Sequence, residues 1–151
     1  MIRLESVTED NWIDVARLSV SDAQQAFLDR PIGIIARAYV YRNQNARVFV
    51  IINDSDIIGL ALVRDLDEAP ACYDLQQFMI DQRFQNKGYG TEALKRILSL
   101  LKDEGKYDCV EVCVNKADAS ALRVYEKAGF IDTGYVDEDV PDCLNLRYYF
   151  R

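Results

Sequence analysis

Histidine is absent from this 151-residue sequence, and its cysteines show no paired spacing. The four cysteines never form a Cys-x-x-Cys motif; they are Cys72, Cys109, Cys113 and Cys143. A serine or cysteine nucleophile activated by histidine is therefore excluded, and neither a zinc site nor any other metal site is expected. Cys109 and Cys113 fall four residues apart on an expected strand, so we expect reduced thiols that pack as small apolar side chains.

The sequence also lacks an excess of positive charge and any long apolar run. It has 18 Lys and Arg against 25 Asp and Glu, which gives a net charge of −7 and a pI near 4.6. Nucleic acid is therefore not an expected partner, because its phosphates require a basic surface. No run reaches the length of a signal peptide or a membrane span, so we expect a cytoplasmic protein with no membrane partner.

The length fits one domain over residues 1–151, with enough chain to bury a core. Apolar periodicity and turn signals predict strands at 2–7, 47–52, 57–63, 72–80, 106–114, 130–136 and 144–150. Helices are expected at 9–20, 22–27, 31–40, 88–104 and 118–128. Because strands come first and later alternate with helices, the sequence predicts a mixed α/β (α+β) fold.

The most informative segment joins the strand ending at Ile80 to the next helix through two closely spaced glycines, Gly88 and Gly90. Glycine has no Cβ, so the backbone there can bend sharply and let an anion approach its N–H groups. The helix that follows adds unpaired N–H groups and a positive dipole end, while Lys87 and Thr91 add a charge and a hydroxyl donor. Taken alone, the segment allows two interpretations, a phosphate site or merely a tight turn.

A second segment, from Asp118 to Phe130, ends in Tyr125-Glu126-Lys127-Ala128-Gly129-Phe130. Together with Gln85-Asn86-Lys87-Gly88-Tyr89-Gly90 it resembles the GNAT family, the acyl-CoA-dependent N-acetyltransferases. The family signature joins Gln/Arg-x-x-Gly-x-Gly/Ala to a short helix that ends in Tyr-x-x-x-Gly-Phe. The resemblance implies the GNAT fold, a mixed central sheet of roughly six to seven strands with helices on both faces.

A competing interpretation is a dinucleotide site. Gly88-Tyr-Gly90-Thr-Glu-Ala93 also fits the G-x-G-x-x-A fingerprint, and Glu111 falls about where a ribose-binding acid would stand. That fold requires its first glycine close behind the strand and several further βα units. Here polar residues 82–87 intervene and too little chain remains, so we favour the GNAT interpretation.

The resemblance implies acetyl-CoA as cosubstrate. The pyrophosphate would be held by backbone N–H groups of six consecutive residues and by the next side chain: Gln85, Asn86, Lys87, Gly88, Tyr89, Gly90 and Thr91. The strand through Phe78, Met79 and Ile80 would splay from its neighbour and pair with the pantetheine amides. Tyr125 would donate a proton to the leaving thiolate, whereas its alternative role is that of a core aromatic.

One position departs from the family pattern. Asp118 stands where the family usually has Asn, and an ionised carboxylate cannot donate a hydrogen bond to pantetheine. Asp118 still suits a helix N-cap, and Asn115 at the end of the preceding strand could supply an amide instead.

The attacking amine must lose a proton, and two acids are candidates to accept it. Glu111 lies on the strand beside the cofactor strand, and Asp74 lies on the cofactor strand itself; either could equally be a solvated surface acid. Gln76 stands where polyamine enzymes tend to carry an acid. Other acids fall in segments expected to border an acceptor groove, where they could select a polycation: Asp22, Asp29, Asp65, Asp67, Glu68, Asp137, Glu138 and Asp139.

The sequence therefore predicts an N-acetyltransferase that acts on a small-molecule amine. Leu75 to Gly90 and Val20 to Phe27 look most similar to bacterial spermine/spermidine acetyltransferases, which favours a polyamine. The alternatives are a protein N-terminus, a lysine or an amine antibiotic as acceptor, or a non-catalytic acyl-CoA sensor. Exposed C-terminal strands often pair between subunits in such folds, so the resemblance also allows a homodimer.

Overall fold

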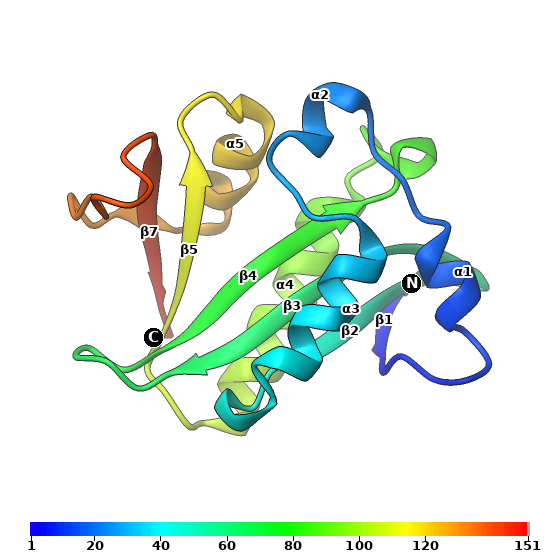
Figure 1. Cartoon of the computed structure of the whole chain (residues 1–151), viewed down its shortest axis with the longest axis horizontal. Helices are drawn as coiled ribbons and strands as arrows, with labels where there is room; N and C mark the ends of the chain where they lie inside the picture. The colour runs from blue at the N-terminus through cyan, green and yellow to red at the C-terminus, as the bar shows by residue number, and fades with distance from the viewer. Residues whose placement is uncertain (151) are drawn as a thin grey trace.

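The computed structural model describes residues 1–150 and contains one seven-stranded sheet (Figure 1). The strands are β1 (Ile2–Glu5), β2 (Arg47–Asn53), β3 (Asp56–Leu66), β4 (Cys72–Ile80), β5 (Cys109–Asn115), β6 (Ile131–Asp132) and β7 (Cys143–Tyr149). The α-helices are α1 (Trp12–Ala16), α2 (Asp22–Gln25), α3 (Pro31–Val40), α4 (Tyr89–Glu104) and α5 (Ala119–Ala128). Short 3₁₀ turns occupy Arg42–Gln44 and Gln82–Phe84.

The strands lie in the order β1-β2-β3-β4-β5-β7-β6, and all neighbours are antiparallel except β4 and β5. Hairpin connections produce the antiparallel pairs β2–β3 and β3–β4, whereas the α4 crossover brings β5 beside β4 in parallel. The expected mixed sheet is confirmed.

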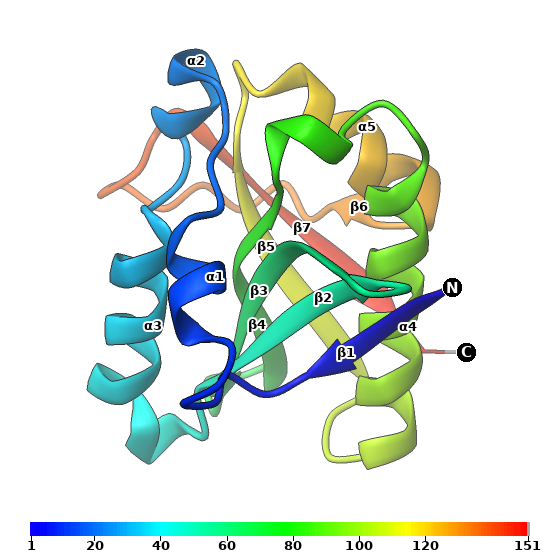
Figure 2. The same cartoon turned by 90° about the vertical axis from the view of Figure 1, so that its right-hand side faces the viewer.

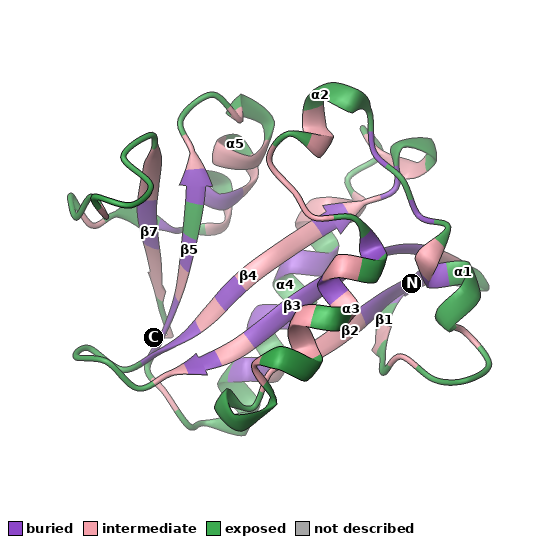
Figure 3. Ribbon diagram, viewed as in Figure 1, coloured by how far each residue is buried: buried purple, intermediate pink, exposed green. Residues whose placement is uncertain are grey.

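Helices cover both faces of this sheet, as the resemblance to the GNAT family implied (Figure 2). Alternate residues of β3 pack against the helices on the two faces of the sheet, because successive side chains of a strand point to opposite faces. Ala61 and Val63 pack in the cluster that contains α4 and α5, while Leu60 and Leu62 pack in the cluster of α1 and α3. Figure 3 shows the buried residues concentrated along the central strands and the inner side of α4.

The feature that shapes the site is the separation of β4 from β5. Their register pairs are limited to Tyr73 with Val110 and Asp74 with Glu111. On its other side β4 stays paired with β3 as far as Ile80, so residues 75–80 lose a partner on one edge only. The two strands diverge from their shared end in Figure 1.

A bulge in β4 lies directly beyond this point. Leu62 of β3 pairs with Gln77 and Val63 pairs with Leu75, which leaves Gln76 as the extra residue. Bulges bend a strand and increase its twist, which turns the upper part of β4 away from β5.

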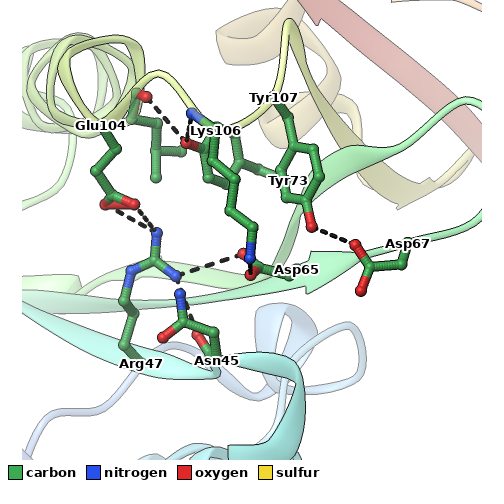
Figure 4. Close-up of polar contacts among 9 residues, drawn as sticks. Asn45, Arg47, Asp65, Asp67, Tyr73, Glu104, Lys106 and Tyr107 are labelled. Carbon is green, nitrogen blue, oxygen red and sulfur yellow. Dashed lines mark hydrogen bonds and ion pairs between the residues drawn. The ribbon is translucent and has the colours of Figure 1, made fainter.

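A polar network closes the other end of the sheet (Figure 4). The guanidinium of Arg47 donates to both carboxylate oxygens of Glu104 at 2.7 and 2.9 Å. Lys106 pairs with the buried Asp65, and the Tyr107 hydroxyl bonds Asp67. Asp65 and Asp67, which were expected to border the acceptor groove, both lie at the opposite end of the β3–β4 hairpin from Ile80.

Three further expectations differ from the structure. The helix predicted over residues 9–20 ends at Ala16, because Ser19 bonds to the distant β4 end: its N–H donates to Asp81 at 2.9 Å and its C=O accepts from Gln82 at 2.8 Å. The strand predicted over 130–136 has two residues, since Thr133 instead bonds the Asn145 carbonyl through both its N–H and its hydroxyl. Cys113, expected to pack as an apolar thiol, is exposed.

Candidate active site

A cavity of about 640 Å³ opens where β4 leaves β5. Four segments line it: the end of β4, the connection into α4, one side of α5, and the region around α2. The lining residues are Val20, Gln24, Leu28, Phe78, Met79, Ile80, Gln85, Asn86, Gly88, Gly90, Thr91, Asp118, Ser120, Ala121, Arg123, Val124, Tyr125 and Lys127.

The glycine segment forms one wall with the geometry of an anion site. Gly88 has φ of +84°, a left-handed value that an L side chain adopts at a cost, and it is the N-cap of α4 without any side-chain cap. The first N–H groups of α4 therefore lack side-chain partners, and they lie at the positive end of a 16-residue helix. A Cβ built on Gly90 would lie 3.7 Å from Ile80 Cγ1, so the fold tolerates a methyl group here; Gly90 and Ile80 both line the cavity.

Buried Asp81 anchors this wall to the segment before α2. Its carboxylate accepts from the Ser19 N–H at 2.9 Å and from the N–H and Nε of Arg83, each at 2.9 Å. Burial alone would raise the pKa of Asp81, but these hydrogen bonds and the charge of Arg83 outweigh it and lower that pKa.

A reciprocal amide pair connects the same two segments at the cavity. Gln24 Nε2 donates to Gln85 Oε1, and Gln85 Nε2 donates to Gln24 Oε1, both at 3.0 Å. Gln85 Nε2 also donates to the Ile80 carbonyl at 2.8 Å, so the end of β4, the glycine segment and α2 are held together.

Tyr125 lies on α5 with its side chain buried and in the cavity wall. Its ring packs against Phe130 and Phe78, with centroids 5.3 and 6.3 Å away. Among residues 1–150 its hydroxyl has no hydrogen-bond partner, so it is available to a ligand. Burial, reinforced by the negative charge of Asp118, raises the pKa of Tyr125, so the phenol stays protonated at neutral pH.

The residue that departs from the family pattern caps α5. Asp118 Oδ1 accepts from the Ala121 N–H at 3.3 Å, and Asp118 also lines the cavity. Asn115 does not line it; its Oδ1 accepts from the Ala117 N–H at 2.9 Å within the β5–α5 turn.

The two candidate bases belong to a row of charges across four strands. Arg64, Asp74, Glu111 and Arg147 are successive register partners on β3, β4, β5 and β7. Arg64 Nε donates to Asp74 Oδ2 at 2.8 Å, and Arg147 Nη2 donates to Glu111 Oε2 at 2.9 Å. Burial raises the pKa of Asp74, the charge of Glu111 adds to the rise, and Arg64 opposes it.

The structure brings most of the expected cofactor residues together. The cavity contains Phe78, Met79, Ile80, Gln85, Asn86, Gly88, Gly90, Thr91, Asp118 and Tyr125. Four expected residues lie outside its lining: Lys87, Tyr89, Asn115 and Glu111. The Tyr89 side chain instead packs against the cluster of Ile2, Ile51, Ile58 and Ala93.

Sequence reasoning assigned no binding role to several lining residues. On α5 these are Ser120, Arg123, Val124 and Lys127, whose helical spacing places them on one side of the helix with Ala121. Around α2 they are Val20, Gln24 and Leu28. The spacing on α5 was a signal that could have found the first group, because it repeats every three or four residues.

Residues 1–150 contain neither a cluster of metal-ligating side chains nor a helix that could span a membrane. No group of three or more potential metal-ligating side chains is present in that range. No helix in that range has the length and apolarity needed to span a membrane.

The sequence profile of the Acetyltransferase (GNAT) family matches residues 12–130 of this chain. The chain therefore belongs to the GNAT family of acetyltransferases. It is an N-acetyltransferase, and its cosubstrate is acetyl-CoA, as the two motifs implied.

The curated and solved relatives described next are similar in length to this chain. The spermine/spermidine N(1)-acetyltransferase of Bacillus subtilis is 25% identical over 144 residues, which cover 90% of this chain and 91% of that protein. The aminoglycoside acetyltransferase AAC(6')-Ib, solved with coenzyme A, superposes with a TM-score of 0.82 at 16% identity, covering 99% and 95% of the two chains. Spermidine N-acetyltransferase from Vibrio cholerae, solved with CoA and spermine, gives 0.78 at 16% identity, covering 98% and 95%.

Proposed function

We propose that this enzyme transfers the acetyl group of acetyl-CoA directly to a primary amine of a small molecule, with a polyamine such as spermidine or spermine as the leading acceptor. The observation that carries the proposal is the unpaired edge of β4 over residues 75–80, which opens onto the cavity that Tyr125 lines. The pantetheine amides would pair with this edge as an added strand.

The cavity, together with the two acids at the last paired position of β4 and β5, would supply the parts of a direct transfer. N–H groups at the start of α4 would hold the pyrophosphate, and a β4 backbone N–H would polarise the thioester carbonyl and stabilise the tetrahedral oxyanion. Tyr125 would protonate the departing thiolate. Glu111, or its neighbour Asp74, would accept the proton of the amine directly or through water.

The polyamine assignment rests on the curated Bacillus relative and on the Vibrio enzyme, whose structure holds spermine. The neighbouring aminoglycoside enzyme favours an amine antibiotic as a second candidate. Of the acids that could select a polycation, Asp65 and Asp67 lie outside the lining of the cavity, and Asp29 is paired with Arg37. We propose a cytoplasmic location for the reaction, and a homodimer through the C-terminal strands stays a prediction.

A CoA-release assay across spermidine, spermine, amino acids, aminoglycosides and peptides tests the proposal. Polyamine acetylation predicts that spermidine or spermine gives the highest kcat/KM. A higher value for an aminoglycoside would overturn the polyamine assignment. A sensor predicts that acetyl-CoA binds without release of CoA for any of these amines.

A further inference from the structure

We propose that Arg123 and Lys127 of α5 bind the 3′-phosphate of CoA, so that the enzyme distinguishes CoA from its 3′-dephospho form. The inference rests on acetyl-CoA as the cosubstrate but not on the identity of the acceptor. Both residues line the cavity, and both are exposed.

Their position on α5 gives the two cations a common direction. Arg123 and Lys127 are four residues apart on one helix, so their Cα atoms are separated by about 6 Å along the axis and lie on the same side. A single phosphate monoester could contact both side chains at this separation. The guanidinium can bond two phosphate oxygens side by side, and the ammonium adds a point charge.

Neither cation is already satisfied. Within the described range, the side chains of Arg123 and Lys127 make no hydrogen bond or ion pair. Other basic side chains are held by acids of the fold; Arg47, Arg64, Lys106 and Arg147 are examples. Two unpaired cations in the wall of one cavity therefore indicate an anionic ligand.

The sign of the charge on each substrate indicates which of them the two cations bind. An amine acceptor is positively charged in water at neutral pH, so a wall with two cations would repel it. CoA carries a pyrophosphate and a 3′-phosphate, while the protein carries a net charge of −7 and repels such an anion at long range. Local positive charge is therefore needed on the cofactor side.

The pyrophosphate already has partners that need no side-chain cation. The start of α4 offers its N–H groups and its dipole through Gly88 and Gly90. The 3′-phosphate, which carries close to two further negative charges, is the group of CoA that this site leaves unmatched. Arg123 and Lys127 supply the matching charge from the α5 wall.

Calorimetric titration of the full chain with CoA and with 3′-dephospho-CoA tests this assignment. The wild type should bind CoA about tenfold more tightly than dephospho-CoA at low salt, since charge-assisted bonds to phosphate are strong. The double variant Arg123→Gln/Lys127→Gln should reduce that ratio to within about threefold by weakening CoA alone. Lys102→Gln removes one positive charge from an exposed position of α4 outside the cavity, and should keep the wild-type ratio.

The results of these titrations decide whether Arg123 and Lys127 bind the 3′-phosphate. A wild-type ratio near one, or an unchanged ratio in the double variant, overturns the proposal. Equal weakening of CoA and dephospho-CoA also overturns it, because it assigns the two residues to the pyrophosphate. A single variant that removes the preference by itself supports the site and identifies the contacting residue. Failure of every amine in the CoA-release assay would count against the proposed acceptor and would leave these binding ratios unaffected.

Discussion

Asp74 of β4 and Glu111 of β5 face one another at the last paired position before the two strands separate. Each carboxylate is bonded by one arginine through one oxygen, which leaves Asp74 Oδ1 and Glu111 Oε1 without a protein partner among residues 1–150. The negative charge of Glu111 adds to the rise in the pKa of Asp74 that burial causes.

Removing the charge of Glu111 should lower the pKa of Asp74. The negative charge of Glu111 disfavours ionisation of Asp74, so Glu111→Gln removes the part of the rise that this charge adds to the effect of burial. The measurement is an NMR titration of the Asp74 carboxyl carbon in labelled protein. Glu9→Gln, at an exposed turn, is the control and should leave the Asp74 titration where it is. An Asp74 pKa that stays put or rises in Glu111→Gln would show that the two groups are not coupled.

Glu111→Gln should also lower kcat by about 10²–10⁴-fold if Glu111 accepts the amine proton, because an amide cannot act as a base. The Kd of acetyl-CoA should stay within error. Asp74→Asn is the matched variant. If Asp74→Asn alone gives the loss of kcat, the base is Asp74.

Tyr125→Phe should reduce kcat by about 10²–10⁴-fold and leave acetyl-CoA binding and Tm nearly unchanged. Stability is retained because the hydroxyl has no partner in the fold to lose, as the described residues show. Stopped-flow or steady-state CoA release gives kcat, and thermal unfolding gives Tm. Tyr39→Phe is the control for the chemical change, because the Tyr39 side chain is exposed on α3, outside the cavity. Unchanged turnover in Tyr125→Phe would remove Tyr125 as the acid.

Gly90→Ala should separate folding from cofactor binding. Alanine in place of a helical glycine stabilises a helix by about 0.5–1 kcal/mol, and the new methyl group meets Ile80 at an ordinary distance. The same methyl group lies in the cavity wall, so acetyl-CoA should bind about tenfold more weakly. Gly88→Ala is the contrasting variant: its left-handed backbone should cost about 1–2 kcal/mol of stability. Tight binding in a stable Gly90→Ala protein would exclude close approach of the cofactor at this position.

Asp81→Asn should lower the stability of the fold at neutral pH and weaken the binding of acetyl-CoA. The pKa of Asp81 is lower in the folded state than in the unfolded chain, so its contribution is fully present above about pH 4 and is lost as the pH falls through the folded pKa. The variant should therefore be about 1–3 kcal/mol less stable at pH 7, with a smaller loss on acidification. Urea unfolding between about pH 3 and 7 measures this, and a raised KM for acetyl-CoA reports the loosened glycine segment. Asp103→Asn, exposed on α4, should reproduce neither effect.

The elements that the sequence located well are those whose own residues decide their structure. The buried positions of α4 follow helical spacing from Ala93 to Leu101, and the hairpin of β2 and β3 is marked by its polar turn. The early helix was drawn too long because Ser19 is bonded by Asp81 and Gln82, which are 62 and 63 residues away. No local pattern carries that information.

The residues of the site also fall into two groups, those that one sequence segment supplies and those that only the fold brings together. The glycine segment is continuous in sequence, and its backbone conformation could be inferred from Gly88 and Gly90. The walls from α2 and α5 come together only through the fold. Gln24 therefore carried no functional signal in the sequence, whereas the spacing of Arg123 and Lys127 marks one side of α5 without indicating a ligand. Motif membership also did not fix side-chain direction, as Tyr89 turns into the core beside Ala93.

The divergence of β4 from β5 has a consequence for the enzyme without its cosubstrate. A free strand edge in the middle of a sheet is a template on which another polypeptide can add a strand, which is a common route to aggregation. In this fold the interior edge over residues 75–80 is such a template, and the proposed binding mode would cover it with the pantetheine arm. Bound acetyl-CoA is therefore expected to slow aggregation of the chain as well as to serve as its cosubstrate.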